Sequence, residues 1–221
     1  VNYTGTGVHG DILFTDSIVT AASNEDSAGY LFTSDHGDAI QGHCLFAKGP
    51  TVYDEIARVP LIFSGKACAS HKVYPGTVSH VDLPATVMDY MGLPVPQCFE
   101  GKSLVSLLSD PDHAEHTDEA FVEFARYEID HDGFGGFQPM RAIVTNRFKL
   151  AVHLLDSDEL YDCQEDPHEL HNLINDPEYA SIRDELHDRL LNWMNETRDP
   201  FRGYQWQCRA WRTDEAPGWE V

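Results

Sequence analysis

Positive charge is what this chain has least of. Its 221 residues include 37 Asp and Glu but only 15 Lys and Arg, which gives a formal net charge of −22. Such an acidic protein is poorly matched to the phosphates of nucleic acids or to an anionic membrane surface. We therefore expect neither a nucleic-acid nor a membrane partner. The acidity fits an ordinary acidic surface and an adaptation to high salt about equally well.

Long apolar runs and paired cysteines are also missing. The longest apolar runs, such as residues 59–64, are far shorter than the roughly 20 residues that span a bilayer. None of the five cysteines forms a CxxC pair, which excludes a zinc ribbon or a thioredoxin motif. We expect mostly reduced thiols, and a Cys68–Cys98 pair remains open. The content of 42% hydrophobic and 11% aromatic residues predicts a folded globular protein.

The first half of the chain combines short apolar strands with helices. A weak helical pattern runs through residues 12–22, and Tyr30–Ser34 and Val59–Ser64 predict strands. Val78–Met91 predicts a strand edge followed by a helix with Asp82 as N-cap and a glycine after its last turn. These elements predict an α/β domain over residues 1–108.

The second half predicts a smaller subdomain over residues 109–221. It begins with the polar linker Ser109–Glu119. We expect strands at Ala120–Tyr127, Arg141–Thr145 and Phe148–Leu154, and a short edge strand at Glu159–Asp162. Asp176-Pro177 starts a helix that extends to residue 197, before an irregular tail. The expected fold is thus α/β with an antiparallel sheet packed by the helix at 177–197.

Asp35 and His36 directly follow the apolar strand Tyr30–Ser34. Ligands of open α/β sheets gather beyond the carboxyl ends of strands, and Gly37 allows a sharp turn there. A carboxylate beside an imidazole can bind a divalent cation. The alternative is a strand-ending Asp that caps a turn, with an incidental His.

Lys48 lies 48 − 35 = 13 residues beyond Asp35, on a loop with Gly42 and Gly49-Pro50. Its ammonium group is a compact charge that could hold an anionic oxygen. The alternative is a solvated surface lysine, although lysine is scarce in this chain. His43 lies between the two positions and could line the same site.

Several blocks in this order resemble the sulfatase family of the alkaline phosphatase superfamily. The blocks are SDHGD, GHCLFAKGP, YDE and RVPLI, then VSHVDLPATVMDYMGLPVP and EGKSL, and finally RFKLAVHLLDSDELYDCQEDPHELHNL. The likeness extends from about Phe32 to Arg202, which is most of the chain. It implies the C-terminal part of an alkaline-phosphatase-like, sulfatase α/β fold, with a smaller antiparallel subdomain.

The resemblance also implies roles for three residues. Asp35 and His36 fall on the family's second pair of metal ligands, where many members have Asp-Asn. Lys48 falls on the lysine that contacts the sulfate group and helps the leaving oxygen depart. The implied metal is Ca²⁺, with Mn²⁺ as the alternative because imidazole suits transition metals better. The implied substrate is a small-molecule or glycan sulfate ester.

The sequence departs from the family pattern in one important respect. The family's nucleophile is a formylglycine made from Cys or Ser in a C/S-x-P-x-R motif, and these 221 residues contain no such motif. The N-terminal Asp pair of the metal site also has no matching positions. We therefore expect this chain to represent the C-terminal portion of a sulfatase, and expect it to be inactive by itself.

The remaining predictions concern the substrate pocket and the rival functions. The segment Glu128–Arg141 contains three glycines, and His131 and Arg141 would suit a loop that meets an anionic substrate. A Gly-rich crossover between strands is the plain alternative. Two other functions stay open, a phosphonate monoester or phosphodiester hydrolase of the same superfamily and a non-catalytic binding module.

Overall fold

The computed structural model describes residues 17–22, 29–45, 48–65, 68–69, 71–125 and 138–214. The chain divides into two compact units. Among the described residues, the three-stranded unit comprises those within 12–38 and 55–120, and the four-stranded unit comprises those within 39–54 and 121–221. The sequence prediction instead divided the chain once, at residue 108.

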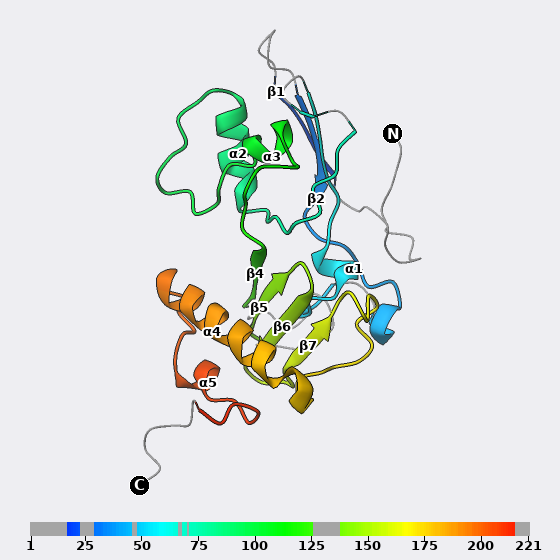
Figure 1. Ribbon diagram of the computed structural model, residues 1–221, viewed down its shortest axis with the longest axis vertical. Helices are drawn as coiled ribbons and strands as arrows, with labels where there is room; N and C mark the ends of the chain where they lie inside the picture. Colours follow the sequence, from blue (N-terminus) through cyan, green and yellow to red (C-terminus); the bar gives the residue numbers. More distant parts are fainter. Residues whose placement is uncertain are drawn as a thin grey trace. The chain divides into compact units, whose positions relative to one another are not determined.

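The three-stranded unit contains an antiparallel sheet in the order β1-β2-β3 (Figure 1). Its strands are β1 Ser17–Ala22, β2 Gly29–Ser34 and β3 Leu61–Gly65. Its helices are α2 Asp82–Tyr90 and α3 Val105–Ser109, and the short α1 Asp54–Ala57 lies at the boundary of the two units. The predicted strands at Tyr30–Ser34 and Val59–Ser64 are thus confirmed, within two residues at each end.

The helix predicted across residues 12–22 is wrong for the part that the structure describes. Residues Ser17–Ala22 form a strand that pairs with β2 along its whole length, from Ser17 opposite Ser34 to Ala22 opposite Gly29. The run Ile18-Val19-Thr20 is β-branched and fits a pleated sheet better than a helix. Pairing with β2 therefore prevails over a weak helical pattern.

Helix α2 occurs where it was predicted, but its first turn is built differently. Asp82 is the first helical residue instead of the N-cap. Its carboxylate accepts hydrogen bonds from the backbone N–H of Ser79 (3.0 Å) and of Lys102 (2.9 Å). Asp82 therefore joins the helix start to the loop before α3. Gly92 has φ +69° just beyond the helix, as expected of a glycine that ends one.

The four-stranded unit contains a sheet in the order β4-β5-β6-β7, in which β6 pairs antiparallel with both β5 and β7. The strands are β4 Glu119–Phe124, β5 Met140–Thr145, β6 Phe148–His153 and β7 Glu159–Asp162. The other elements are the 3-10 turns η1 Gly42–Cys44 and η2 Pro177–Tyr179, and the helices α4 Ala180–Glu196 and α5 Tyr204–Gln207. The predicted hairpin, the edge strand and the long helix are confirmed.

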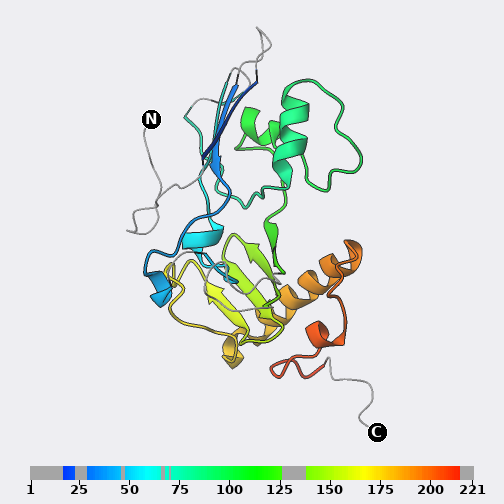
Figure 2. The same cartoon turned by 180° about the vertical axis from the view of Figure 1, so that it is seen from behind.

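The two faces of this sheet have different partners. On one face, Ile143, Leu150 and Leu160 form a core with Leu186 and Leu190 of α4, and Figures 1 and 2 show that helix lying along the sheet. On the opposite face, Met140, Ala142 and Ala151 pack around Val52, which is fully buried. The segment that contains Val52 therefore covers the face turned away from α4.

Helix α4 starts as the sequence predicted. The Asp176 side chain accepts a hydrogen bond from the Glu178 N–H (2.9 Å), and Pro177 occupies the first turn. The tail after α4 was expected to be irregular, but in its described part the short helix α5 places Trp206 in the same hydrophobic core as Leu190.

Two expectations from composition can be compared with the described residues. All five cysteines are free thiols, so Cys68 and Cys98 do not form a disulfide. Within the described ranges, no helix has both the length and the apolar character that a membrane crossing needs.

Candidate functional site

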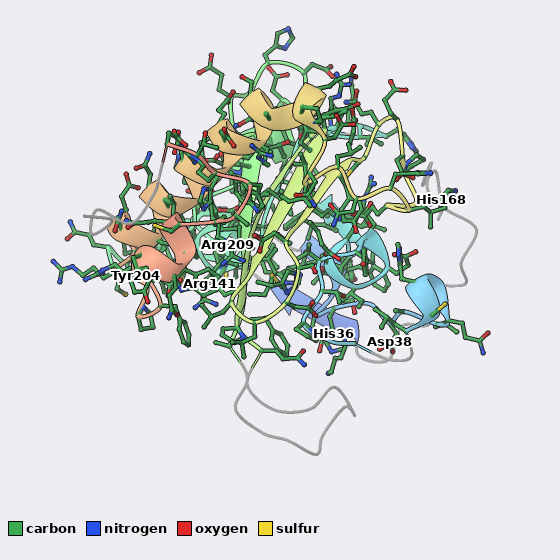
Figure 3. The ribbon with its side chains drawn as sticks, turned by 90° about the horizontal axis from the view of Figure 1, so that it is seen from below. His36, Asp38, Arg141, His168, Tyr204 and Arg209 are labelled. Atoms are coloured by element: carbon green, nitrogen blue, oxygen red, sulfur yellow. The ribbon has the colours of Figure 1, made fainter. Side chains whose placement is uncertain are left out.

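Asp35 and His36 lie in the turn that follows β2, in the segment where Figure 3 labels His36 and Asp38. The Asp35 carboxylate accepts a hydrogen bond through Oδ1 from the His36 N–H (2.9 Å). Ser34 Oγ donates to the His36 carbonyl (2.8 Å). Local hydrogen bonds therefore fix both side chains next to each other at the end of the strand.

The His36 ring is oriented by its own backbone neighbour. Its Nδ1 lies 3.0 Å from the carbonyl oxygen of Gly37, which can only accept, so Nδ1 carries the hydrogen. The other ring nitrogen, Nε2, lies 3.2 Å from Asp35 Oδ2. A ring nitrogen and a carboxylate oxygen at this distance could both bind one cation.

The spacing of these two atoms suits a divalent metal. Two ligands at right angles around a divalent cation at about 2.0–2.6 Å would lie about 2.8–3.7 Å apart. The observed 3.2 Å falls in that range. A backbone carbonyl that holds the far nitrogen of a histidine is also the usual support for a metal ligand. Asp35 and His36 therefore fit two of the roughly six ligands that such an ion takes.

Gly37 has no room for a side chain. A Cβ atom at this position would lie 2.0 Å from the Glu55 carbonyl oxygen, and the Gly37 N–H donates to the Ile56 carbonyl (2.9 Å). A backbone hydrogen bond therefore joins the turn that contains Asp35 and His36 directly to α1. The glycine predicted as a point for a sharp turn is required here by the close approach of two backbones.

Lys48 and His43 belong to the four-stranded unit, on the segment Ala39–Asp54. Lys48 is half-buried and precedes Gly49 and Pro50, which are both buried. The His43 ring stacks on Tyr53, with ring centroids 3.7 Å apart and planes 2° from parallel. The segment thus folds back so that its beginning packs on its end.

The turn around His43 has an unusual backbone. Gln41, His43 and Cys44 all have positive φ angles, of 65°, 49° and 59°. Each such conformation costs a non-glycine residue energy, and such residues gather at functional sites. This observation fits a role of His43 at the site, although the sequence signal was only its position between Asp35 and Lys48.

Arg141 forms a buried ion pair and hydrogen bonds within the protein core. Its Nε and Nη2 atoms bind the Asp199 carboxylate, and its Nη1 atom donates to the carbonyls of Phe124 (3.1 Å) and Met140 (2.9 Å). Both side chains are buried, at 2% and 0% exposure. The guanidinium also lies over the Phe201 ring. We therefore do not include Arg141, labelled in Figure 3, in the candidate site.

One predicted site residue is outside the described ranges, and one buried lysine was not predicted. His131 lies outside the described residues. Conversely, sequence reasoning missed Lys149, which is only 1% exposed and meets Asp54 and Glu169. One signal was available, since Lys149 alternates within the strand pattern FKLAVH onto the same face as Ala151, where a lysine is unexpected in a buried strand.

Comparison with known proteins identifies relatives that match most of this chain. A family model described as the C-terminal part of N-sulphoglucosamine sulphohydrolase matches residues 42–196. The uncharacterized sulfatase YidJ of Escherichia coli is 43% identical over 189 residues, which is 86% of this chain and 36% of that protein. The chain therefore spans little more than a third of this relative's length.

Solved structures agree with this assignment. A protein in complex with its substrate D-glucosamine-2-N,6-O-disulfate matches with a TM-score of 0.69 and 27% identity, over 79% of this chain and 35% of that one. The phosphonate monoester hydrolase of Agrobacterium radiobacter matches with a TM-score of 0.64 and 27% identity, over 75% and 34%. Because the family model covers more than half of the chain, the protein belongs to the sulfatase family, in its N-sulphoglucosamine sulphohydrolase C-terminal group.

Proposed function

We propose that the protein hydrolyses sulfate esters with the help of a divalent cation. The observation that carries this proposal is the Asp35–His36 pair, in which the carboxylate oxygen Oδ2 and the imidazole nitrogen Nε2 lie 3.2 Å apart while Gly37 holds the other ring nitrogen. In a member of the sulfatase family, two such acceptors at a strand end are best explained as metal ligands.

The roles follow from the chemistry of the side chains. Asp35 and His36 would hold Ca²⁺, with Mn²⁺ as the alternative that an imidazole ligand favours. The bound ion would neutralise negative charge on the sulfate oxygens. The Lys48 ammonium group would bind a sulfate oxygen and stabilise the negative charge that develops on the leaving oxygen. The nucleophile would be a formylglycine from a C/S-x-P-x-R motif, which these 221 residues do not contain.

The substrate class is proposed from the relatives. The matching family model is named for an N-sulphated glucosamine, and one structural relative binds a disulfated glucosamine. A sulfated sugar or glycan is therefore the substrate that we propose, with His43 and His131 as contacts to it. The stacked pair of His43 and Tyr53 holds the His43 ring in one orientation, as a substrate contact requires.

Hydrolysis of phosphonate monoesters is the second candidate. It is favoured by the structural likeness to a phosphonate monoester hydrolase and by a histidine at position 36. A binding module without catalytic activity is the third candidate.

Metal dependence tests the proposal. The protein expressed from its complete coding sequence should hydrolyse 4-nitrophenyl sulfate, and chelation should lower the rate by at least about 10²-fold, because the cation stabilises transition-state charge. Added Ca²⁺ or Mn²⁺ should restore the rate. The 221-residue chain alone serves as the negative control and should show no turnover. An unchanged rate after complete removal of divalent ions would contradict the proposal.

A further inference from the structure

Lys149 lies on β6, on the sheet face that is turned away from α4, and its ammonium group is almost fully enclosed. The side chain is 1% exposed. Its Nζ atom donates to the carbonyl of Val52 (2.7 Å), to Asp54 Oδ1 (2.7 Å) and to Glu169 Oε1 (2.5 Å). All three donor hydrogens of the ammonium group therefore have acceptors. Two of these acceptors belong to the segment that carries Lys48.

Glu169 contacts both Lys149 and the backbone of the segment that contains Val52 and Asp54. Its second oxygen, Oε2, accepts a hydrogen bond from the Asp54 backbone N–H (2.7 Å). Glu169 is 2% exposed and has a positive φ of 53°, a strained conformation for a non-glycine residue. A buried carboxylate in a strained position indicates that the surrounding contacts determine its place. Here those contacts are Lys149 and the backbone of Asp54.

The charges in this cluster hold it together. Burial by itself would lower the pKa of Lys149, but Asp54 and Glu169 outweigh that effect and the pKa lies above its ordinary value. Lys149 is therefore charged at neutral pH. Burial raises the pKa of Glu169, against the opposing effect of Lys149. Loss of the ammonium group would leave the buried Glu169 carboxylate and the partly buried Asp54 carboxylate without a counter-ion.

The Lys149 contacts with Val52 and Asp54 lie only a few residues after Lys48 in the sequence, and the backbone between them is restricted. Val52 is 52 − 48 = 4 residues beyond Lys48, and Gly49 and Pro50 between them are buried. Proline fixes its own φ angle and limits the residue before it. The Val52 side chain is enclosed by Met140, Ala142 and Ala151. A fixed Val52 therefore restricts where the backbone of Lys48 can lie.

From this geometry we propose that Lys149 and Glu169 are positioning residues, which hold Lys48 where it meets the sulfate group and the leaving oxygen. This inference rests on the proposed function for the role of Lys48. It adds that the four-stranded sheet sets the location of a catalytic side chain on the neighbouring segment. A misplacement of about 1 Å can cost an enzyme about 10²-fold in rate.

The dependence of the hydrolysis rate on the pKa of the leaving phenol provides a readout that a general loss of stability would not change. Rates are measured for aryl sulfates whose phenols span a wide range of pKa, with the protein expressed from its complete coding sequence. If Lys48 stabilises the leaving oxygen, Lys48→Ala should slow the esters of weakly acidic phenols most. Lys149→Met should show the same trend, from about 10-fold for good leaving groups to about 10²-fold for poor ones.

Two comparisons sharpen this experiment. Lys102→Met makes the same chemical change at an exposed lysine and should leave all rates unchanged. The double variant Lys48→Ala/Lys149→Met should be no slower than Lys48→Ala, because positioning residues act only through Lys48. Should Lys149→Met fail to fold, Glu169→Gln keeps the side-chain shape and removes one charge, and it should show the same trend more weakly.

Hydrogen exchange gives a readout that needs no activity. In Lys149→Met the amides of residues 51–54 should exchange at least about 10-fold faster, whereas those of Ile143 and Leu150, in the core under α4, should be unchanged. The inference would be overturned if the amides of residues 51–54 exchanged at the wild-type rate in Lys149→Met. It would also be overturned if Lys149→Met slowed the hydrolysis of all esters equally, or if the rate reductions of the two single variants multiplied in the double variant. A wild-type protein without sulfatase activity would instead contradict the proposed function, and the exchange result would still decide whether Lys149 holds the backbone of residues 51–54 in place.

Discussion

Lys48→Ala is expected to lower kcat for an aryl sulfate by about 10²–10³-fold, the range found when one preorganised group that stabilises transition-state charge is removed. Its ammonium group would act on oxygens that gain negative charge as the sulfate ester breaks. The effect on kcat should therefore exceed the effect on KM. Steady-state kinetics with the protein expressed from its complete coding sequence provides the measurement.

Lys102→Met again provides the matched control, because this lysine is exposed. A second comparison is Lys48→Arg, which keeps the charge but changes its shape and should recover only part of the rate. If Lys48→Ala retained the wild-type kcat, Lys48 would be a solvated surface lysine, as the plain interpretation of the sequence allows.

The second large effect concerns stability. Arg141→Met should lower the free energy of unfolding by about 3–5 kcal/mol, because Asp199 would be left buried without its counter-ion. Urea denaturation followed by circular dichroism gives this value. Arg189→Met is the control, since Arg189 makes an ion pair with Glu185 (3.7 Å) near the surface and should change stability by less than about 1 kcal/mol.

This result also decides the role of Arg141. A normal stability with a raised KM for the substrate would show that the arginine meets the substrate, as its position in the sequence suggested. Loss of stability, with an unchanged KM in the molecules that remain folded, would agree with the structural role seen here.

Local patterns predicted most of the elements. Asp176-Pro177 and the stripe through Leu186 and Leu190 fixed the place of α4, since a capping side chain and a 3.6-residue period are properties of neighbouring residues. The strand at residues 17–22 was missed for the opposite reason. Its stability comes from pairing with β2, a partner that the short pattern does not contain.

The candidate site was predictable as residue types but not as geometry. Asp35 and His36 were identified by their place after a strand, yet the tautomer of His36 depends on the Gly37 carbonyl. Arg141 illustrates the opposite case, because nothing near it in the sequence indicates that Asp199, 58 residues away, binds it. Long-range ion pairs of this kind depend on the tertiary fold alone.

The relative rates toward a sulfate and a phosphonate test the central claim most directly. The protein expressed from its complete coding sequence is assayed, under identical metal conditions, with 4-nitrophenyl sulfate and with an aryl phosphonate monoester of the same phenol. Our account predicts a kcat/KM for the sulfate that exceeds that for the phosphonate by at least about 10-fold, or about 1.4 kcal/mol of transition-state stabilisation. Predominant hydrolysis of the phosphonate would contradict it.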